Sequence, residues 1–306
     1  MGSQWRIFGR AIASATGLWL LCAGVLAQVT GPQTLREAFE QARSQASATG
    51  GGSLFDRPVY LQSSQSSEQL QGDIHAVLDH RFSLVQQTLG TAPAWCRILI
   101  LHLNVKFCRA TRTGQQERLD VGLGRKFDQP LSDVHWLKFV YQARPAREDF
   151  LQLTLQAPSG PLGTRDYRIS VEAMPLNAGQ TLLHLRYSYG FGLSARWAMQ
   201  AYLATLGRDK VGFSKSAHGG GGQPQPVGGL RGVLERNTVR YYLAIESFLG
   251  AQALPPGEQM QRSLEDWFSA TEGYPQQLHE VDRSAYLKMK REEVSRQERE
   301  LPPGRE

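Results

Sequence analysis

Six segments in the middle of the chain alternate apolar and polar residues with a period of two. In the last of them, Leu185, Tyr187 and Tyr189 share one side, while His184 and Arg186 share the other. This period is typical of strands with one buried face, and turn residues separate successive segments. The pattern predicts a meander of six antiparallel strands that is covered on one side. The segments are 101–107, 118–126, 135–142, 150–157, 166–174 and 181–189.

The longest predicted helix spans 230–249, a stretch without proline that follows Gly228 and Gly229 and stops at Gly250. Its apolar residues recur at helical spacing and form a stripe wide enough to pack on a sheet. One polar residue, Asn237, interrupts this stripe one turn before Tyr241. The stripe consists of Leu230, Val233, Leu234, Tyr241, Ala244, Ile245 and Phe248.

The chain after residue 27 divides into three parts. Residues 28–56 contain one helical stretch at 34–45 and end in Ser, Ala and Gly, so we expect a flexible lead-in. Residues 57–250 form the main domain, in which 57–61 and 70–78 are extended and 214–229 is a glycine-rich loop that could act as a lid. Residues 251–306 form a helical, charged extension. We expect it either to pack on the far side of the long helix or to bind a protein partner through 258–306.

The N-terminus has the features of a secretory signal peptide. Arg6 and Arg10 precede an apolar run that ends at Ala27 with small residues. We expect cleavage after Ala27 and a periplasmic or secreted protein. Two alternatives are an uncleaved membrane anchor, for which the run is short, and lipid attachment at Cys22, which Leu21 before it disfavours.

Removal of residues 1–27 leaves two cysteines, Cys96 and Cys108, and in an oxidising compartment a disulfide bond is the default. Twelve residues of helix would separate them by about 18 Å, and an unbroken strand by more. A disulfide requires Cα atoms about 4.4–6.8 Å apart. The bond therefore requires the chain to reverse between the two residues.

Composition and motifs exclude more than they suggest. The 306 residues are 41% apolar and 20% charged, which is ordinary for a globular protein, and the net charge of +6 is spread along the chain. Without a block of Lys and Arg, nucleic acid is not indicated as a partner. We find no nucleotide-binding, nucleophile or metalloprotease motif and predict no cofactor, metal or catalytic residue. His184 is interpreted as a solvated histidine on the polar side of its strand.

Six residues are candidates for ligand contacts. A buried amide on an apolar helix face costs roughly 1–3 kcal/mol unless it is hydrogen-bonded. Asn237 therefore either bonds to the protein or anchors a ligand, with the Tyr241 hydroxyl facing the same space. Arg240 could bind an acidic headgroup, although a salt bridge to the sheet is the simpler interpretation. The others are aromatic residues of the predicted inner face, which belong to the core or line a cavity: Tyr167, Tyr187 and Tyr189.

Four stretches resemble exported bacterial members, without assigned activity, of the START-related helix-grip superfamily of lipid-transfer and polyketide-cyclase-like proteins. They are GPLGTRDYRISVEAMPL (160–176), LRYSYGFG (185–192), YLATLGRDKVGFS (202–214) and GGLRGVLERNTVRYYLAIESFL (228–249). The resemblance runs from about residue 57 to 250. It implies an α+β fold in which a curved antiparallel sheet wraps around the long C-terminal helix and encloses an apolar cavity.

The function that the resemblance implies is binding of a lipid or other hydrophobic small molecule between the sheet and the long helix. Two alternatives remain open. One is a cyclase-like enzyme that uses the same pocket, for which we find no acid–base pair. The other is a non-catalytic envelope protein whose core is filled by its own side chains.

Overall fold

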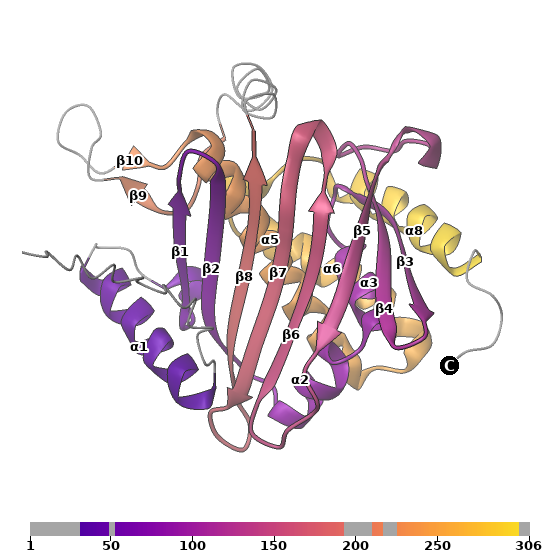
Figure 1. Cartoon of the computed structure of the whole chain (residues 1–306). Coiled ribbons are helices and arrows are strands. Elements are labelled where there is room, and N and C mark those ends of the chain that lie inside the picture. Colours follow the sequence, from indigo (N-terminus) through magenta and orange to yellow (C-terminus); the bar gives the residue numbers. More distant parts are fainter. Residues whose placement is uncertain (1–30, 49–52, 193–209, 217–224, 300–306) are drawn as a thin grey trace, which may run out of the picture. The chain divides into compact units, whose positions relative to one another are not determined.

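A computed structural model of the chain describes residues 31–48, 53–192, 210–216 and 225–299. Eight strands form one antiparallel sheet in the order β1-β2-β8-β7-β6-β5-β4-β3, which curves around the long helix α5 (Figure 1). The predicted fold class, an α+β arrangement of a curved antiparallel sheet and a long C-terminal helix, is confirmed. The strands are β1 Val59–Gln65, β2 Gln69–Leu78, β3 Val105–Thr113, β4 Gln116–Leu123, β5 His135–Ala143, β6 Leu151–Ser159, β7 Thr164–Pro175 and β8 Thr181–Phe191.

The register of the sheet explains why the alternating pattern produces one buried face. Ile169 of β7 lies opposite Leu155 of β6 and Tyr187 of β8, so apolar residues meet across three neighbouring strands. Because successive side chains of a strand point to opposite faces, this register places the whole apolar set on one side. That side faces α2 Phe82–Leu89, α3 Ala92–Leu99 and α5 Gly229–Gly250.

The prediction of a strand from residue 101 is wrong at its start. The backbone N–H groups of Leu101 and His102 donate to the carbonyl oxygens of Ile98 and Leu99, which continues the turns of α3. β3 begins only at Val105. Leu101, His102 and Leu103 are all buried in this turn, so the alternation of apolar residues in the sequence does not correspond to one buried face here.

Helix α5 is enclosed on several sides. Sixteen of its 22 residues are buried, because it contacts β1, β2 and β8 of the sheet as well as α3 and α6. Three of its charged residues, Glu235, Arg236 and Arg240, are buried too. Both Phe213 and Ser214 donate their backbone N–H groups to Glu235 Oε2, at 2.7 and 2.9 Å, which fixes one end of the glycine-rich loop.

The lead-in does not behave as a flexible segment where the structure describes it. Helix α1 Pro32–Ala48 lies on the face of the sheet opposite to α5 (Figure 1). Leu35, Phe39 and Ala42 are buried there, and the Phe39 ring lies 5.6 Å from that of Tyr60 in an edge-to-face arrangement. The helix therefore belongs to the folded domain.

The C-terminal extension packs on the domain through α6 Pro256–Glu272, α7 Pro275–Leu278 and α8 Arg283–Arg299. Trp267 of α6 stacks on Tyr286 of α8 at 5.1 Å and donates its indole N–H to the carbonyl oxygen of Arg240. Lys106 of β3 forms a buried ion pair with Glu293 of α8, with 3.0 Å between Nζ and Oε1. Of the two expectations for the extension, packing is the one that the structure shows for 256–299.

Cys96 and Cys108 form a disulfide bond with their Cα atoms 5.1 Å apart. The reversal that this bond requires occurs between α3 and β3. Two expectations fall outside the described residues: the signal peptide at 1–27 and the central part of the glycine-rich loop. No helix in the described ranges is both long and apolar enough to span a bilayer.

Candidate ligand-binding cleft

A cleft of about 420 Å³ lies at one end of the sheet, beside α5. Its walls come from α5, from β8, from the β4–β5 connection and from the β6–β7 turn, and in Figure 1 this connection and this turn lie at the upper end of the sheet. Five of the six predicted ligand residues line it: Tyr167, Tyr187, Tyr189, Asn237 and Tyr241. Strand parity brings the first three together, and one helical turn separates the other two.

The aromatic side chains form a continuous wall along the cleft. Tyr167 stacks on Tyr189 at 5.3 Å between ring centroids, and Tyr189 lies 5.6 Å from Tyr187. Tyr187 then meets Tyr241 edge to face at 5.0 Å, and Tyr241 stacks on the ring of His102 at 5.0 Å. Offset and edge-to-face pairs at these distances are the favoured arrangements of aromatic rings. The wall joins two strands of the sheet to α5 and to the turn after α3.

The tyrosine hydroxyls of the wall are neutral. Burial raises the pKa of Tyr187 well above its ordinary value, and burial also raises the pKa values of Tyr189 and Tyr241. The hydroxyl of Tyr167 donates to Thr164 Oγ1 at 2.9 Å. The wall therefore offers apolar ring faces with a few polar edges, as sites for hydrophobic small molecules commonly do.

His102 belongs to the site and was missed by sequence reasoning. It is 2% exposed and lines the inner part of the cleft. Its Nδ1 accepts a hydrogen bond from the backbone N–H of Asn104 at 3.1 Å. Burial lowers the pKa of His102 well below its ordinary value, and the positive charges of Arg240 and Lys290 add to this effect. The ring is therefore neutral and, with Nδ1 acting as an acceptor, carries its proton on Nε2.

Arg240 does not line the cleft, and its guanidinium is engaged within the protein. Its Nη2 lies 2.8 Å from Glu280 Oε1 and 3.2 Å from the carbonyl oxygen of Leu278. The ion pair thus forms with the C-terminal extension, whereas the simpler interpretation of the sequence was a salt bridge to the sheet. Nη1 of Arg240 lies 3.3 Å from Asn237 Oδ1. Arg240 therefore orients the amide of Asn237, which is itself only partly buried.

The interior next to the cleft is filled by side chains. The space enclosed by residues such as Val121, Leu137, Phe139 and Tyr241 is only about 10 Å³. A cavity needs about that volume to hold one water molecule. At this level the sheet and helix are therefore in close contact, and the space for a ligand lies at the end of the sheet, in contrast to the expected hollow between the two.

The long helix lies across the concave face of an eight-stranded antiparallel sheet that begins with two strands and continues, after two short helices, with a six-stranded meander. The chain has a helix-grip fold. This assignment rests on the order and packing of its own elements.

Comparisons with solved structures find similar proteins at low identity. The chain is similar to the Zhui aromatase/cyclase from Streptomyces sp. R1128 (13% identity, 46% of this chain and 86% of that chain, TM-score 0.33). It is also similar to a conserved protein from Geobacillus kaustophilus (12%, 59% and 95%, TM-score 0.35) and to a START superfamily protein from Mycobacterium smegmatis (15%, 46% and 97%, TM-score 0.29). No protein-family model and no curated protein sequence matches the chain.

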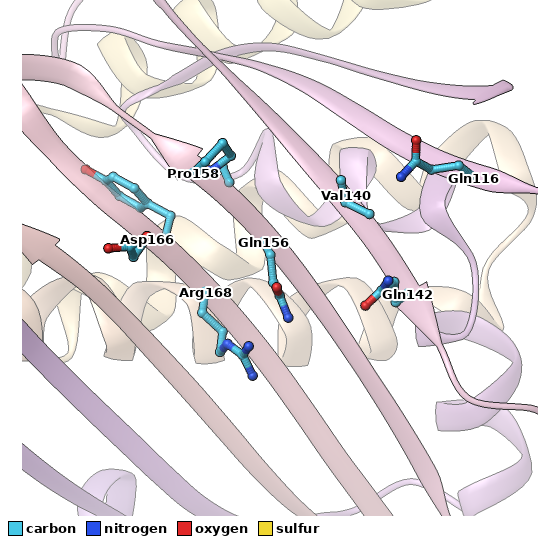
Figure 2. A pocket seen from close by; sticks show the side chains of 9 residues that line it. Gln116, Val140, Gln142, Gln156, Pro158, Asp166 and Arg168 are labelled. Atoms are coloured by element: carbon cyan, nitrogen blue, oxygen red, sulfur yellow. The ribbon is translucent and has the colours of Figure 1, made fainter. Parts of the chain in front are cut away.

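A second hollow, of about 480 Å³, lies on the opposite face of the helix-grip sheet. Figure 2 shows Gln142, Gln156 and Arg168 projecting from neighbouring strands, with Val140 and Pro158 beside them. Most of these side chains are polar and belong to the face that α5 does not cover. The hollow offers little apolar surface, so it is a weaker candidate for a hydrophobic ligand than the cleft.

His184 is not solvated, which corrects its interpretation from the sequence. Its ring stacks on His75 at 4.3 Å, and its Nε2 lies 2.8 Å from Asp73 Oδ1 and its Nδ1 3.4 Å from Glu172 Oε2. Burial opposes protonation, but the hydrogen bonds to the two carboxylates outweigh it and raise the pKa of His184. Within the described ranges, no three His, Cys, Asp or Glu side chains are grouped so as to hold a metal ion.

Proposed function

We propose that this helix-grip protein binds a hydrophobic small molecule, with at least one ring, in the cleft at the end of the sheet. The observation that carries this proposal is the aromatic wall of Tyr167, Tyr189, Tyr187, Tyr241 and His102. The cleft volume of about 420 Å³ falls in the range of roughly 300–1,000 Å³ that is common for small-molecule sites. Flat rings match such a wall better than a long acyl chain does.

The energy available from such a site is moderate. A bicyclic aromatic ligand that buries on the order of 200 Å² of apolar surface gains roughly 5 kcal/mol at about 25 cal/mol per Å². Lost translational and rotational freedom offsets part of this gain. We therefore expect dissociation constants between micromolar and millimolar for simple ring compounds.

Binding is tested with N-phenyl-1-naphthylamine, an uncharged dye whose fluorescence rises in apolar surroundings. The wild-type protein should enhance its fluorescence in a saturable way. Asn237→Phe, which places a phenyl ring in the cleft, should abolish the enhancement. Gln142→Phe adds the same ring to the second hollow and should leave the enhancement unchanged; the reverse pattern would assign the dye to that hollow and reject the cleft.

The cyclase-like alternative needs a group that transfers protons to the reacting atoms. Burial raises the pKa of the wall tyrosines and lowers that of His102, which makes the tyrosines weaker acids and the histidine a weaker base than usual. The alternative of a purely structural protein predicts that the dye finds no saturable site.

We also propose that the protein is exported after cleavage behind Ala27. The signal-like pattern of residues 1–27 supports this proposal, as does the disulfide bond of Cys96 and Cys108, because such bonds persist mainly outside the cytoplasm. The intact mass of the protein purified from its native host tests it. A mature N-terminus at Gln28 is expected, and a chain that retains Met1–Ala27 would reject the proposal.

A further inference from the structure

The inner part of the cleft contains a buried hydrogen-bond donor without a partner. His102 Nε2 makes no hydrogen bond of normal geometry among the described residues, and its interaction with the Asn237 side chain raises the pKa of the ring too little to offset burial. A buried polar group usually has a partner, because an unsatisfied donor is costly. A ring that stacks on Tyr241 and needs a partner at Nε2 is therefore a candidate ligand contact.

The orientation of this ring is fixed from both sides. The backbone N–H of Asn104 holds Nδ1, so the Nε2–H is the free edge. The turn itself is held by the extension: Lys290 Nζ donates to the carbonyl oxygens of His102 and Val105, both at 2.7 Å. Tyr286 donates its hydroxyl to the carbonyl oxygen of Leu101 at 2.9 Å. A donor that is held in this way is organised before any ligand arrives.

Asn237 supplies a second donor at the same place. Its Oδ1 accepts from Arg240 Nη1 at 3.3 Å, and the residue lines the cleft, so its amide NH₂ is the candidate donor. Other polar groups of the lining are used within the protein. Asn104 Nδ2 donates to the carbonyl oxygen of Gly124, and Gln129 Oε1 accepts from the backbone N–H of Arg125. Among the described residues, His102 Nε2 is thus the buried donor of the lining that has no partner of normal geometry.

We propose that the ligand carries an acceptor oxygen of the carbonyl type, which His102 Nε2–H and the Asn237 amide bind while the ring system lies along the tyrosine wall. This inference rests on the proposed function and adds the polar half of the ligand to it. His102 is then a specificity-determining residue. Each of the nearby carboxylates is shared by two cations, Glu280 by Arg240 and Lys126 and Glu293 by Lys290 and Lys106, so these cations are held within the protein.

Two probes of nearly equal shape test the inference. 2-Acetylnaphthalene carries a carbonyl acceptor, and 2-ethylnaphthalene is its counterpart without one. The wild-type protein should bind the acetyl compound about tenfold more tightly, as measured by displacement of N-phenyl-1-naphthylamine. His102→Phe keeps the stacking on Tyr241 and should remove this preference by weakening only the acetyl compound. His102→Gln, which retains an N–H donor, should restore part of it.

Nitrogen-15 NMR of the histidine ring gives a direct second measurement. The acetyl compound should move the Nε2 resonance of His102, and the ethyl compound should not. Equal affinities of the wild-type protein for both compounds would overturn the inference while the proposed function stands. Absence of saturable binding for both would overturn the proposed function itself.

Discussion

Nζ of Lys290 in the C-terminal helix α8 lies 2.7 Å from the backbone carbonyl oxygen of His102 in the wall of the cleft. The two residues are far apart in the sequence, and their contact joins the extension to the candidate site. Lys290 is fully buried and also lies 2.8 Å from Glu293 Oε2. The extension therefore has a structural role in the site: it holds the turn that carries the buried donor.

Replacement of this lysine should affect both stability and binding. Lys290→Met removes a buried charged donor from the carbonyl oxygens of His102 and Val105, and the His102 oxygen keeps the backbone N–H of Val105, so we expect the free energy of unfolding to fall by about 3 kcal/mol. The preference for 2-acetylnaphthalene over 2-ethylnaphthalene should also shrink. Urea denaturation and dye displacement measure the two effects.

Lys106→Met is the matched control for that experiment. Lys106 also pairs with Glu293 in the same buried network, but it makes no hydrogen bond to the His102 turn. The Lys106→Met variant should be less stable than the wild type and keep its preference for 2-acetylnaphthalene over 2-ethylnaphthalene. If the two variants change the preference equally, the turn is not held by Lys290 in the way described.

The stacked histidines on the other face of the sheet should make stability depend on pH. Burial, and the charge of His184 beside it, lower the pKa of His75 to about 3. The unfolded chain takes up this proton near pH 6.5, so it binds more protons than the folded protein between about pH 6.5 and 3. The contribution of His75 to stability therefore falls as the pH is lowered through this window.

His75→Phe should flatten this dependence. Relative to the wild type, the variant should gain roughly 4 kcal/mol on going from pH 7 to pH 3, measured by urea denaturation across the range. The raised pKa of His184 acts in the opposite sense: its stabilisation is present below pH 6.5 and is lost as the pH rises through its folded pKa. A wild type and variant with parallel profiles would show that His75 is protonated normally in the fold.

Leu162 lies at the mouth of the cleft in a left-handed conformation, with φ of +58° and 61% of its surface exposed. This conformation costs a non-glycine residue about 1–2 kcal/mol. Leu162→Gly removes the strain at the expense of chain entropy and should raise stability by up to about 1 kcal/mol. It should also weaken dye binding, because an apolar side chain at the mouth is lost. A large loss of stability would mean that Leu162 is held by packing.

Helix α1 provides a test of the domain boundary. Phe39 is 8% exposed and packs against the ring of Tyr60. Phe39→Ala should lower the free energy of unfolding by about 3 kcal/mol, with α1 and the sheet unfolding in one transition. Hydrogen exchange of the α1 amides provides the second measurement. If the amides of 32–48 exchanged as fast as those of an unfolded chain, the prediction of a flexible lead-in would be right after all.

The sequence predicts the sheet well because strand parity is local information. The tyrosines at 167, 187 and 189 could be placed on the inner face from their alternation alone, and Tyr241 and Asn237 from helical spacing. His102 could not be found in this way, because the alternation of 101–107 places it on the polar side of a strand that does not begin until Val105.

Contacts between residues that are far apart in the sequence could not be predicted either. Arg240 pairs with Glu280, a residue of the extension, and no local pattern links the two. The helix at 34–45 was predicted, but the surface that it covers was not. What covers a face depends on three-dimensional packing, which neither propensity nor periodicity records.

The central claim is that the tyrosine wall at the end of the sheet forms the binding site. NMR of protein labelled with ¹³C in its tyrosine rings, titrated with 2-acetylnaphthalene, tests this claim most directly. We predict saturable shifts for Tyr167, Tyr187, Tyr189 and Tyr241, with little change for Tyr60 on the opposite face. Shifts of the side-chain amides of Gln142 and Gln156 without any change in those four tyrosines would contradict it.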